Sequence, residues 1–283
     1  MDLCDLSQIK ALLARHGFHF SKALGQNFLI VPWVPRQIAA ASGAAAGTGV
    51  LEIGPGIGPL TIQLAQRADR VVCVELDRSL LPILAETLAS CPKAEVVFGD
   101  ILKTDIPALV REKFARLDPI VCANLPYNIT TPAITALIEA GCFSSITVMV
   151  QREVARRICA GPGTGDYGAF SVYCQYYTRP ELLFEVGPEC FVPAPKVTSA
   201  VVRMVPHPPP AEVDNPAHFF QVVRAAFALR RKTLLNSLSL AGPYEKDSLS
   251  RALERCGLSG STRGEQLSIP QFAQLSRALR GLI

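Results

Sequence analysis

Four residues that follow an apolar run carry the most informative chemistry of this chain. The apolar run, residues 119–123, is typical of a buried strand in a parallel sheet, and Asn124, Leu125, Pro126 and Tyr127 come directly after it. The Asn124 side-chain oxygen and the Leu125 carbonyl, held outward by the rigid Pro126, could each accept one N–H of an exocyclic base amine. Tyr127 could stack on the base, a contact worth about 1–3 kcal/mol in single-stranded recognition. The alternative, a strand and turn with Tyr127 packed on the core, stays open on this segment alone.

A glycine-rich turn and two acids are spaced as in a nucleotide-type pocket. Residues 50–53 run into Gly-Pro-Gly-Ile-Gly at 54–58, where Gly54 lets the backbone approach a ligand closely. Glu75 ends the next predicted strand and is the expected acid for ribose hydroxyls, while Asp100 ends the third and could accept from an adenine amine. Ligands of open α/β sheets bind at these strand ends. The spacing admits a dinucleotide or S-adenosylmethionine; an amine clamp has no use in hydride transfer and favours the methyl donor.

Alternating strands and helices must position these residues. The predicted strands are residues 49–53, 70–75, 95–98, 119–123 and 145–150, and the predicted helices between and after them are residues 59–66, 78–88, 131–139 and 152–159. This alternation predicts a doubly wound α/β sheet, which two later strands at 182–186 and 199–205 would complete. The N-terminal residues 1–17 have the apolar spacing of a short surface helix.

A proline-rich break at residues 206–210 divides the chain, and only helical patterns follow it. The expected helices are residues 219–229, 234–240, 249–256 and 272–279. We therefore expect a first domain at 1–205 and a small all-helical domain at 206–283.

The positive charge is confined to the second of these segments. Residues 206–283 hold ten Lys or Arg against six Asp or Glu, whereas residues 1–205 hold eighteen of each, so the whole net charge of +4 lies in the tail. Residues 215–244 contain no acid but include Arg230, Arg231 and Lys232. A solvated helix face is the ordinary explanation of a charge run, yet a basic cluster without acids favours contact with a polyanion.

The bulk composition excludes several classes of protein. With 283 residues, 49% hydrophobic and 18% charged, the chain can bury a core and is not disordered. No apolar stretch reaches the roughly 18 residues of a membrane span, and the N-terminus does not look like a signal peptide, so we expect a cytoplasmic protein. The nine Cys include no C-x-x-C pair and the four His show no ligand spacing, so we expect no metal site. Nothing demands more than a monomer.

Motifs along nearly the whole chain resemble the ribosomal RNA adenine dimethyltransferases, and most closely their bacterial small-subunit branch. The resemblance rests on Gly-Gln-Asn-Phe-Leu at 25–29, the glycine loop at 51–58, Asn-Leu-Pro-Tyr-Asn-Ile at 124–129 and Gln-Arg-Glu-Val-Ala at 151–155. It continues through Tyr-Gly at 167–168 with Ser-Val at 171–172, Phe-Val-Pro-Ala-Pro-Lys-Val-Thr-Ser at 191–199, and Ala-Phe with Arg-Arg-Lys-Thr-Leu at 226–234. Together and in this order, these motifs are highly specific.

The resemblance implies a Rossmann-like class I methyltransferase sheet with S-adenosylmethionine as cofactor. It implies that the cofactor is bound by Asn27, Leu29, Gly54, Glu75, Asp100 and Asn124. Asn124 and Tyr127 would hold the target adenine, with Phe191 on its other face. The implied partner is small-subunit ribosomal RNA in the immature 30S subunit, where two adjacent adenines of a hairpin near the 3′ end of the 16S RNA each receive two methyl groups on N6. The implied role is in small-subunit biogenesis.

Two other functions stay open at this point. The basic tail also suits a ribosome-assembly factor that mainly binds immature subunits. The second alternative is a related enzyme that acts on large-subunit RNA, as the macrolide-resistance methyltransferases do; the residues at 191–197 and the Arg-Arg-Lys tail resemble the small-subunit branch more closely. A nicotinamide-dependent dehydrogenase is a distant further possibility.

Overall fold

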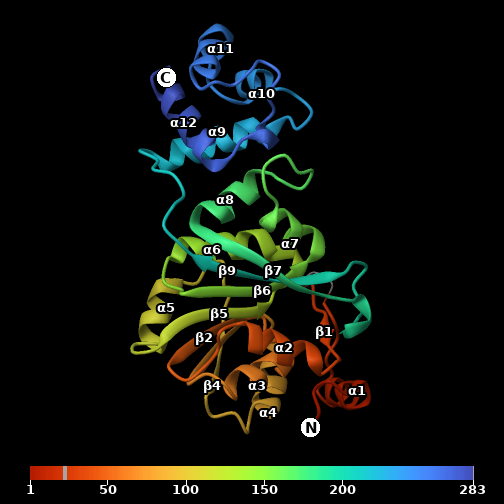
Figure 1. The fold of residues 1–283 in the computed structure, drawn as a ribbon. Helices are drawn as coiled ribbons and strands as arrows, with labels where there is room; N and C mark the ends of the chain where they lie inside the picture. Colours follow the sequence, from red (N-terminus) through yellow and green to blue (C-terminus); the bar gives the residue numbers. More distant parts are fainter. Residues whose placement is uncertain (22–23, 283) are drawn as a thin grey trace. The chain divides into compact units, whose positions relative to one another are not determined.

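The computed structural model describes residues 1–21 and 24–282, and the chain divides into two compact units (Figure 1). Unit 1 contains Met1–Ala155 and Glu181–Pro206, and unit 2 contains Arg156–Pro180 and the chain from His207 onward. The last of these boundaries, after Pro206, lies one residue beyond the division expected from the sequence. The packing adds that residues 156–180 belong with the C-terminal helices.

Unit 1 is built on a seven-stranded sheet with the order β4-β3-β2-β5-β6-β9-β7. Its strands are β2 (Thr48–Ile53), β3 (Arg70–Glu75), β4 (Ala94–Phe98), β5 (Asp118–Asn124), β6 (Ser145–Gln151), β7 (Thr178–Val186) and β9 (Ser199–Pro206). The first five in chain order pair in parallel, and β9 runs antiparallel to β6. The predicted α/β sheet is confirmed, and each of the first five strands lies within one residue of its predicted bounds.

The central strands are buried on both faces, which explains their continuous apolar sequence. Val50 of β2 packs in one core cluster with Val71 and Cys73 of β3 and Cys122 of β5. Side chains of neighbouring residues in a strand point to the opposite face, and Leu51 is also fully buried there. Helices therefore have to cover both faces of this sheet.

The helices of unit 1 are α1 (Leu6–Arg15), α2 (Trp33–Ala41), α3 (Pro59–Ala65), α4 (Leu81–Thr87), α5 (Ile106–Lys113) and α6 (Thr130–Ala140). Helices α2 and α3 pack together over the cluster that contains Val50, and α5 packs with α6. The apolar face of α1 joins α4 and Phe28 in a separate cluster. Helices α2 and α5 have no counterpart among the predicted elements.

A second, two-stranded sheet in unit 1 joins distant parts of the chain. Strand β1 (Phe28–Leu29) pairs antiparallel with β8 (Phe191–Val192), with Leu29 opposite Phe191. Two-residue strands leave no periodicity in the sequence, so this pairing was not predicted. It brings the Gly-Gln-Asn-Phe-Leu segment and the segment that follows β7 side by side.

Unit 2 is helical apart from the first residues of β7, and its core includes more of the chain than residues 206–283. Its helices are α8 (Ala169–Tyr177), α9 (Pro216–Ala228), α10 (Leu234–Ala241), α11 (Lys246–Arg255), α12 (Ile269–Arg280) and the end of α7 (Arg152–Cys159). Tyr176 of α8 packs against Phe219 and Phe220 of α9, with ring centroids 5.2 and 5.4 Å away. These aromatic contacts hold residues 156–180 in this unit. No helix among the described residues has the length and apolarity to cross a lipid bilayer.

Candidate active site

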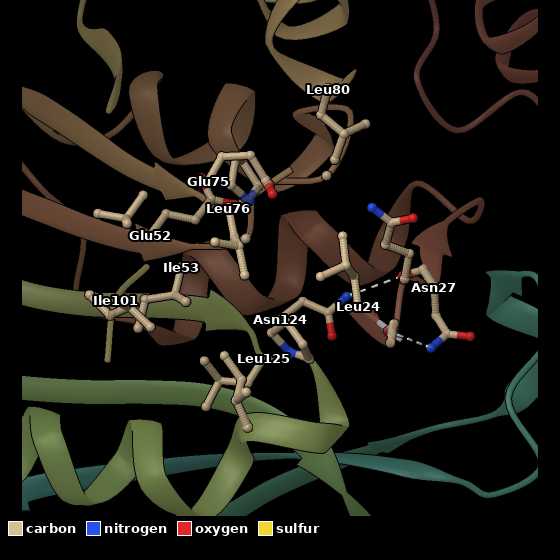
Figure 2. Close-up of a pocket in the computed structure, with 18 of the residues that line it drawn as sticks. Leu24, Asn27, Glu52, Ile53, Glu75, Leu76, Leu80, Ile101, Asn124 and Leu125 are labelled. Carbon is tan, nitrogen blue, oxygen red and sulfur yellow. Dashed lines mark hydrogen bonds between the residues drawn. The ribbon is translucent and has the colours of Figure 1, made fainter. Parts of the chain in front are cut away.

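A deep pocket opens where β2, β3, β4 and β5 of unit 1 end (Figure 2). Its empty space is about 1140 Å³, part of which is continuous with solvent. The lining comes from the segments after these four strands and from residues 24–29, the N-terminal strap. Most residues that the sequence predicted as a site meet here: Asn27, Leu29, Gly54, Glu75, Asp100, Asn124, Leu125 and Tyr127.

The glycine turn after β2 approaches the strap and the segment after β5 closely. Gly54 and Gly56 have φ angles of 65° and 61°, which side-chain-bearing residues rarely adopt. A Cβ on Gly56 would lie 3.1 Å from the Phe28 ring, and a Cβ on Gly54 would lie 3.6 Å from Pro126. Because these positions are glycines, only backbone atoms line this wall of the pocket there.

Glu75 and Asp100 present carboxylates at the ends of β3 and β4. Glu75 is only 6% exposed, accepts a hydrogen bond from the Asp77 backbone N–H at 2.8 Å, and has its pKa raised to about 7 by burial. Asp100 is partly exposed and accepts from the Leu102 backbone N–H at 3.0 Å. Both acids line the pocket, so both can accept hydrogen bonds from hydroxyl or amine groups of a bound nucleoside.

A third acid, which was not among the predicted site residues, also lines the pocket. Glu52 of β2 is 1% exposed, and its Oε2 accepts from the Thr61 hydroxyl at 2.7 Å and from the Cys73 thiol at 3.3 Å. Burial nevertheless raises the pKa of Glu52 to about 7. A charged residue inside an otherwise apolar strand was the available signal in the sequence.

The Asn124 side chain is oriented by the N-terminal strap. Its Nδ2 donates to the Asn27 backbone carbonyl over 3.5 Å, a long contact, and the Asn27 side chain in turn donates to the Gly25 carbonyl at 3.0 Å (dashed lines, Figure 2). With Nδ2 engaged in this way, the Asn124 Oδ1 is the amide atom left to accept from an incoming amine. The strap thus takes part in presenting the predicted clamp.

The residues after Asn124 are held by separate contacts. Leu125 is buried and donates its backbone N–H to the Met149 carbonyl of β6 at 3.1 Å. The Pro126 carbonyl closes a 3-10 turn (Tyr127–Ile129) by accepting from the Ile129 N–H at 3.2 Å. Tyr127 is half-buried, and its hydroxyl lies 2.6 Å from the Ser199 Oγ. Burial raises the pKa of Tyr127, so the phenol keeps its proton at neutral pH.

Gln26, which is not among the predicted site residues, connects the strap to neighbouring segments of the chain. The Gln26 Oε1 accepts from the Ser21 backbone N–H at 2.9 Å, and its Nε2 donates to the Asp77 Oδ2 at 2.6 Å. Asp77 also donates its backbone N–H to Glu75, so one side chain links the strap to the acid at the end of β3. We call this arrangement the Gln26 clasp.

The structure does not bring every predicted residue to the pocket. Phe191 is 3% exposed and packs in the core beside Leu29, and it is absent from the pocket lining among the described residues. Its stacking on a base stays a prediction. Arg230, Arg231 and Lys232 lie in unit 2 on the exposed segment between α9 and α10, and no carboxylate of the described chain lies within ion-pair distance of them.

Comparisons with known proteins agree with this geometry. The family model described as ribosomal RNA adenine dimethylase matches residues 17–280. The ribosomal RNA small subunit methyltransferase A of Geobacillus thermodenitrificans is 47% identical over 287 residues, covering 99% of this chain and 98% of the relative. The protein of the same name from Anoxybacillus flavithermus is 45% identical over 284 residues, covering 98% and 96%.

Solved structures extend the comparison to the fold. A dimethyladenosine transferase from Plasmodium falciparum superposes with a TM-score of 0.74 over 89% of this chain and 97% of its own, at 24% identity. The 23S rRNA methyltransferase ErmE superposes with a TM-score of 0.67 over 89% of this chain and 99% of its own, at 28% identity. The α/β sheet with a helical C-terminal region is common to these proteins. The full-length match and the high identity to the named relatives show that this chain belongs to the ribosomal RNA adenine dimethylases, a family of methyltransferase enzymes.

Proposed function

We propose that this enzyme transfers methyl groups from S-adenosylmethionine to N6 of two adjacent adenines in a hairpin near the 3′ end of 16S ribosomal RNA. The observation that carries the proposal is the clamp after β5: Asn124 with its amide oxygen left to accept, next to Leu125 and Tyr127, at the edge of a nucleoside-sized pocket. The similar proteins from Geobacillus and Anoxybacillus are small subunit methyltransferases by name, which favours the small subunit over the large.

The pocket residues fit the proposed cofactor. Its ribose hydroxyls would donate to Glu75 and its adenine amine to Asp100, while the backbone of Gly54 leaves room for the amino-acid part. Asn27 and Leu29 would close over it from the strap. When bound, S-adenosylmethionine supplies an electrophilic methyl group on a sulfonium. The structure supports this assignment through the types and burial of these side chains.

Asn124, Leu125 and Tyr127 would act on the adenine amine. The amine is a poor nucleophile because its lone pair is delocalised into the ring. Acceptors at the Asn124 Oδ1 and the Leu125 carbonyl would bind its two N–H groups and favour a more pyramidal nitrogen. Tyr127 would hold the base plane so that the nitrogen attacks in line with the breaking carbon–sulfur bond; positioning of this kind can supply about 7–11 kcal/mol of a barrier in favourable cases. The nitrogen becomes strongly acidic on methylation and loses its proton to water, so no general base is required.

The basic segment of unit 2 would supply RNA affinity. Arg230, Arg231 and Lys232 are exposed and without acidic neighbours, which suits contact with phosphates. In this proposal, residues 1–205 hold the cofactor and catalyse, and residues 206–283 bind RNA. Flipping a base out of a hairpin loop costs a few kcal/mol, which phosphate contacts would offset. We infer that the enzyme acts as a monomer on immature 30S subunits in the bacterial cytoplasm and contributes to their biogenesis.

The direct test is radiolabelled methyl transfer from S-adenosylmethionine to unmethylated small and large ribosomal subunits in parallel, with nucleoside analysis of the product. We expect dimethyladenosine in the small-subunit RNA alone. Label in the large subunit would instead indicate an enzyme of the macrolide-resistance type. Tight subunit binding without label in either would indicate an assembly factor.

A further inference from the structure

The half-buried Tyr127 has a hydrogen-bond partner that the proposed chemistry does not yet use. The Tyr127 hydroxyl lies 2.6 Å from the Oγ of Ser199, a residue 72 positions later in the chain. Ser199 is 0% exposed, so water cannot replace its partner. An unpaired buried hydroxyl costs free energy, which favours a persistent contact between the two side chains.

Ser199 is also fixed firmly in space. It is the first residue of β9 and pairs opposite Gln151 at the end of β6. The Arg152 backbone N–H donates to the Thr198 carbonyl at 2.9 Å and extends this ladder by one bond. The order of the sheet places β6 between β5 and β9, so the contact ties the turn after β5 to a strand two positions away. The sheet therefore serves as a rigid support for the Tyr127 ring.

We propose that Ser199 is a positioning residue for methyl transfer: by holding the Tyr127 hydroxyl, it fixes the direction in which the Tyr127 ring projects and so the place where the target adenine stacks. This inference rests on the proposed function, in which Tyr127 contacts the base. The ring has two soft torsions, and its backbone contacts fix only its point of attachment. The Ser199 contact holds the hydroxyl oxygen, which lies on the axis of the ring, and so restrains the first of these torsions; rotation about the axis is restrained because a phenol prefers its hydrogen bond in the ring plane. A misplacement of about 1 Å at a reacting group can cost on the order of 100-fold in rate, so this restraint bears on the chemical step.

The test is a double-mutant cycle of Ser199→Ala and Tyr127→Phe in the full-length enzyme, with unmethylated 30S subunits as substrate. We expect Ser199→Ala to lower kcat about fivefold to tenfold, with the KM for subunits and the dissociation constant for S-adenosylmethionine changed less than twofold. Tyr127→Phe should have an effect of the same size. The double variant should be no slower than either single one, because each change removes the same contact.

Matched variants separate this role from a structural one. Thr147→Val removes another fully buried hydroxyl, on β6, that has no hydrogen-bond partner among the described residues, and it should leave kcat unchanged. Ser199→Thr keeps the hydroxyl and should restore at least half of the wild-type kcat. An unchanged kcat in Ser199→Ala would overturn the inference, as would rate losses that multiply in the double variant.

Two further outcomes are also decisive. If Ser199→Ala does not fold, Tyr127→Phe decides the question, because it removes only one oxygen from a half-buried ring: a lowered kcat supports the inference and an unchanged kcat overturns it. If the wild-type enzyme methylates no subunit at all, the proposed function fails. If the wild-type enzyme is active and Ser199→Ala is equally active, only the inference about Ser199 fails.

Discussion

At the scale of single residues, the Asn124 amide is the centre of the site. Its orientation depends on the carbonyl of Asn27, a residue that the chain brings from 97 positions away. We propose that the same strap residue contacts the cofactor, in which case cofactor binding and presentation of the clamp would share one segment. A cofactor that orders the strap would also order the acceptor for the target amine.

We predict that Asn124→Ala abolishes measurable methyl transfer and leaves the fold intact. The variant loses an acceptor that strengthens in the transition state, and loss of one such group typically costs about 100- to 1000-fold in kcat. Asn124 is partly exposed at the end of β5, so its truncation leaves no large cavity. A tritium-transfer assay, with thermal melting to check folding, gives the answer; a folded and active variant would refute the amine clamp.

A pH dependence of cofactor binding follows from Glu75. Burial raises its pKa in the empty enzyme to about 7, above the ordinary value of 4.5. In the proposed complex, ribose hydroxyls would donate to Glu75 and favour its ionised form, so below pH 7 cofactor binding would release a proton. The affinity for S-adenosylhomocysteine should rise with pH up to about 7 and then level off, as measured by calorimetry from pH 5.5 to 8.

The free energy of unfolding depends on pH with the opposite sign. Since the folded pKa of Glu75 lies above the unfolded one, the empty enzyme loses free energy of unfolding as the pH rises from about 4.5 to about 7. Glu75→Gln should remove the pH slope of cofactor binding that this carboxyl causes. Glu52→Gln is the control, because Glu52 has a similarly raised pKa but already accepts from Thr61 and Cys73. If the slope disappears in Glu52→Gln and persists in Glu75→Gln, the ribose contact is assigned to the wrong acid.

At the scale of elements, the N-terminal strap is held by its pairing in the two-stranded sheet and by the segment after β3. Strand β1 pairs with β8, and the Gln26 clasp bonds Asp77 beyond the end of β3. The strap lines the pocket, and Gly25 lies close to the turn after β5: a Cβ on Gly25 would lie 3.1 Å from the Asn128 Oδ1. The strap therefore forms one wall of the pocket and is held by few side chains.

We predict that Gln26→Ala raises the KM for S-adenosylmethionine about tenfold with little change in kcat. The change removes two hydrogen bonds, each worth about 0.5–1.5 kcal/mol, that hold the strap over the cofactor. Gln26→Glu should raise the KM for S-adenosylmethionine further than Gln26→Ala does, because it places a second carboxylate beside Asp77. Steady-state kinetics at saturating RNA measure both effects. The exposed Gln66 at the end of α3 provides the control Gln66→Glu; an equal KM change there would argue against the clasp.

At the scale of the whole molecule, the pocket and the basic segment belong to different compact units. The pocket is lined by unit 1 alone, and Arg230, Arg231 and Lys232 lie in unit 2. Residues 156–180 leave unit 1, contribute α8 to the core of unit 2 and return as β7. The two units are thus connected by three crossings of the chain, and each has its own hydrophobic core.

We predict that changing Arg230, Arg231 and Lys232 together to Glu weakens RNA binding regardless of sequence and flattens its salt dependence. Loss of three phosphate contacts should reduce the slope of log affinity against log salt by roughly 2 to 3. Filter binding of a small-subunit RNA fragment between about 50 and 300 mM salt measures this slope.

The control for this prediction is a triple charge reversal elsewhere in unit 2. Lys246, Arg251 and Arg255 are exposed on or near α11, and their change to Glu alters the net charge by the same amount. Equal losses of affinity in the two triple variants would mean that net charge matters and the segment between α9 and α10 does not. An unchanged affinity in the first variant would leave its cluster as a solvated surface.

Local patterns in the sequence were enough to predict the central strands, most of their helices and the cluster of site residues at the strand ends. Short continuous apolar runs bounded by turn residues are typical of strands buried on both faces, and the carboxyl ends of parallel strands lie at one edge of a sheet. For this reason Glu75, Asp100 and Asn124 could be placed together before their distances were known. The helical periodicity after residue 210 was equally clear, because amphipathic helices repeat within a few residues.

Contacts between residues that are distant in the chain could be known only from the tertiary structure. The pairing of Leu29 with Phe191, the bond between Tyr127 and Ser199 and the Gln26 clasp depend on register and rotamers, which have no local signature. Pairing in β8 buries Phe191, whose place in a motif had suggested a base contact. The packing of the aromatic residues of α8 against α9 is likewise visible only in the folded chain. Local sequence patterns thus predict which groups meet at the pocket. Which of these groups hold the others in place depends on the fold, because long-range packing sets the orientation of side chains.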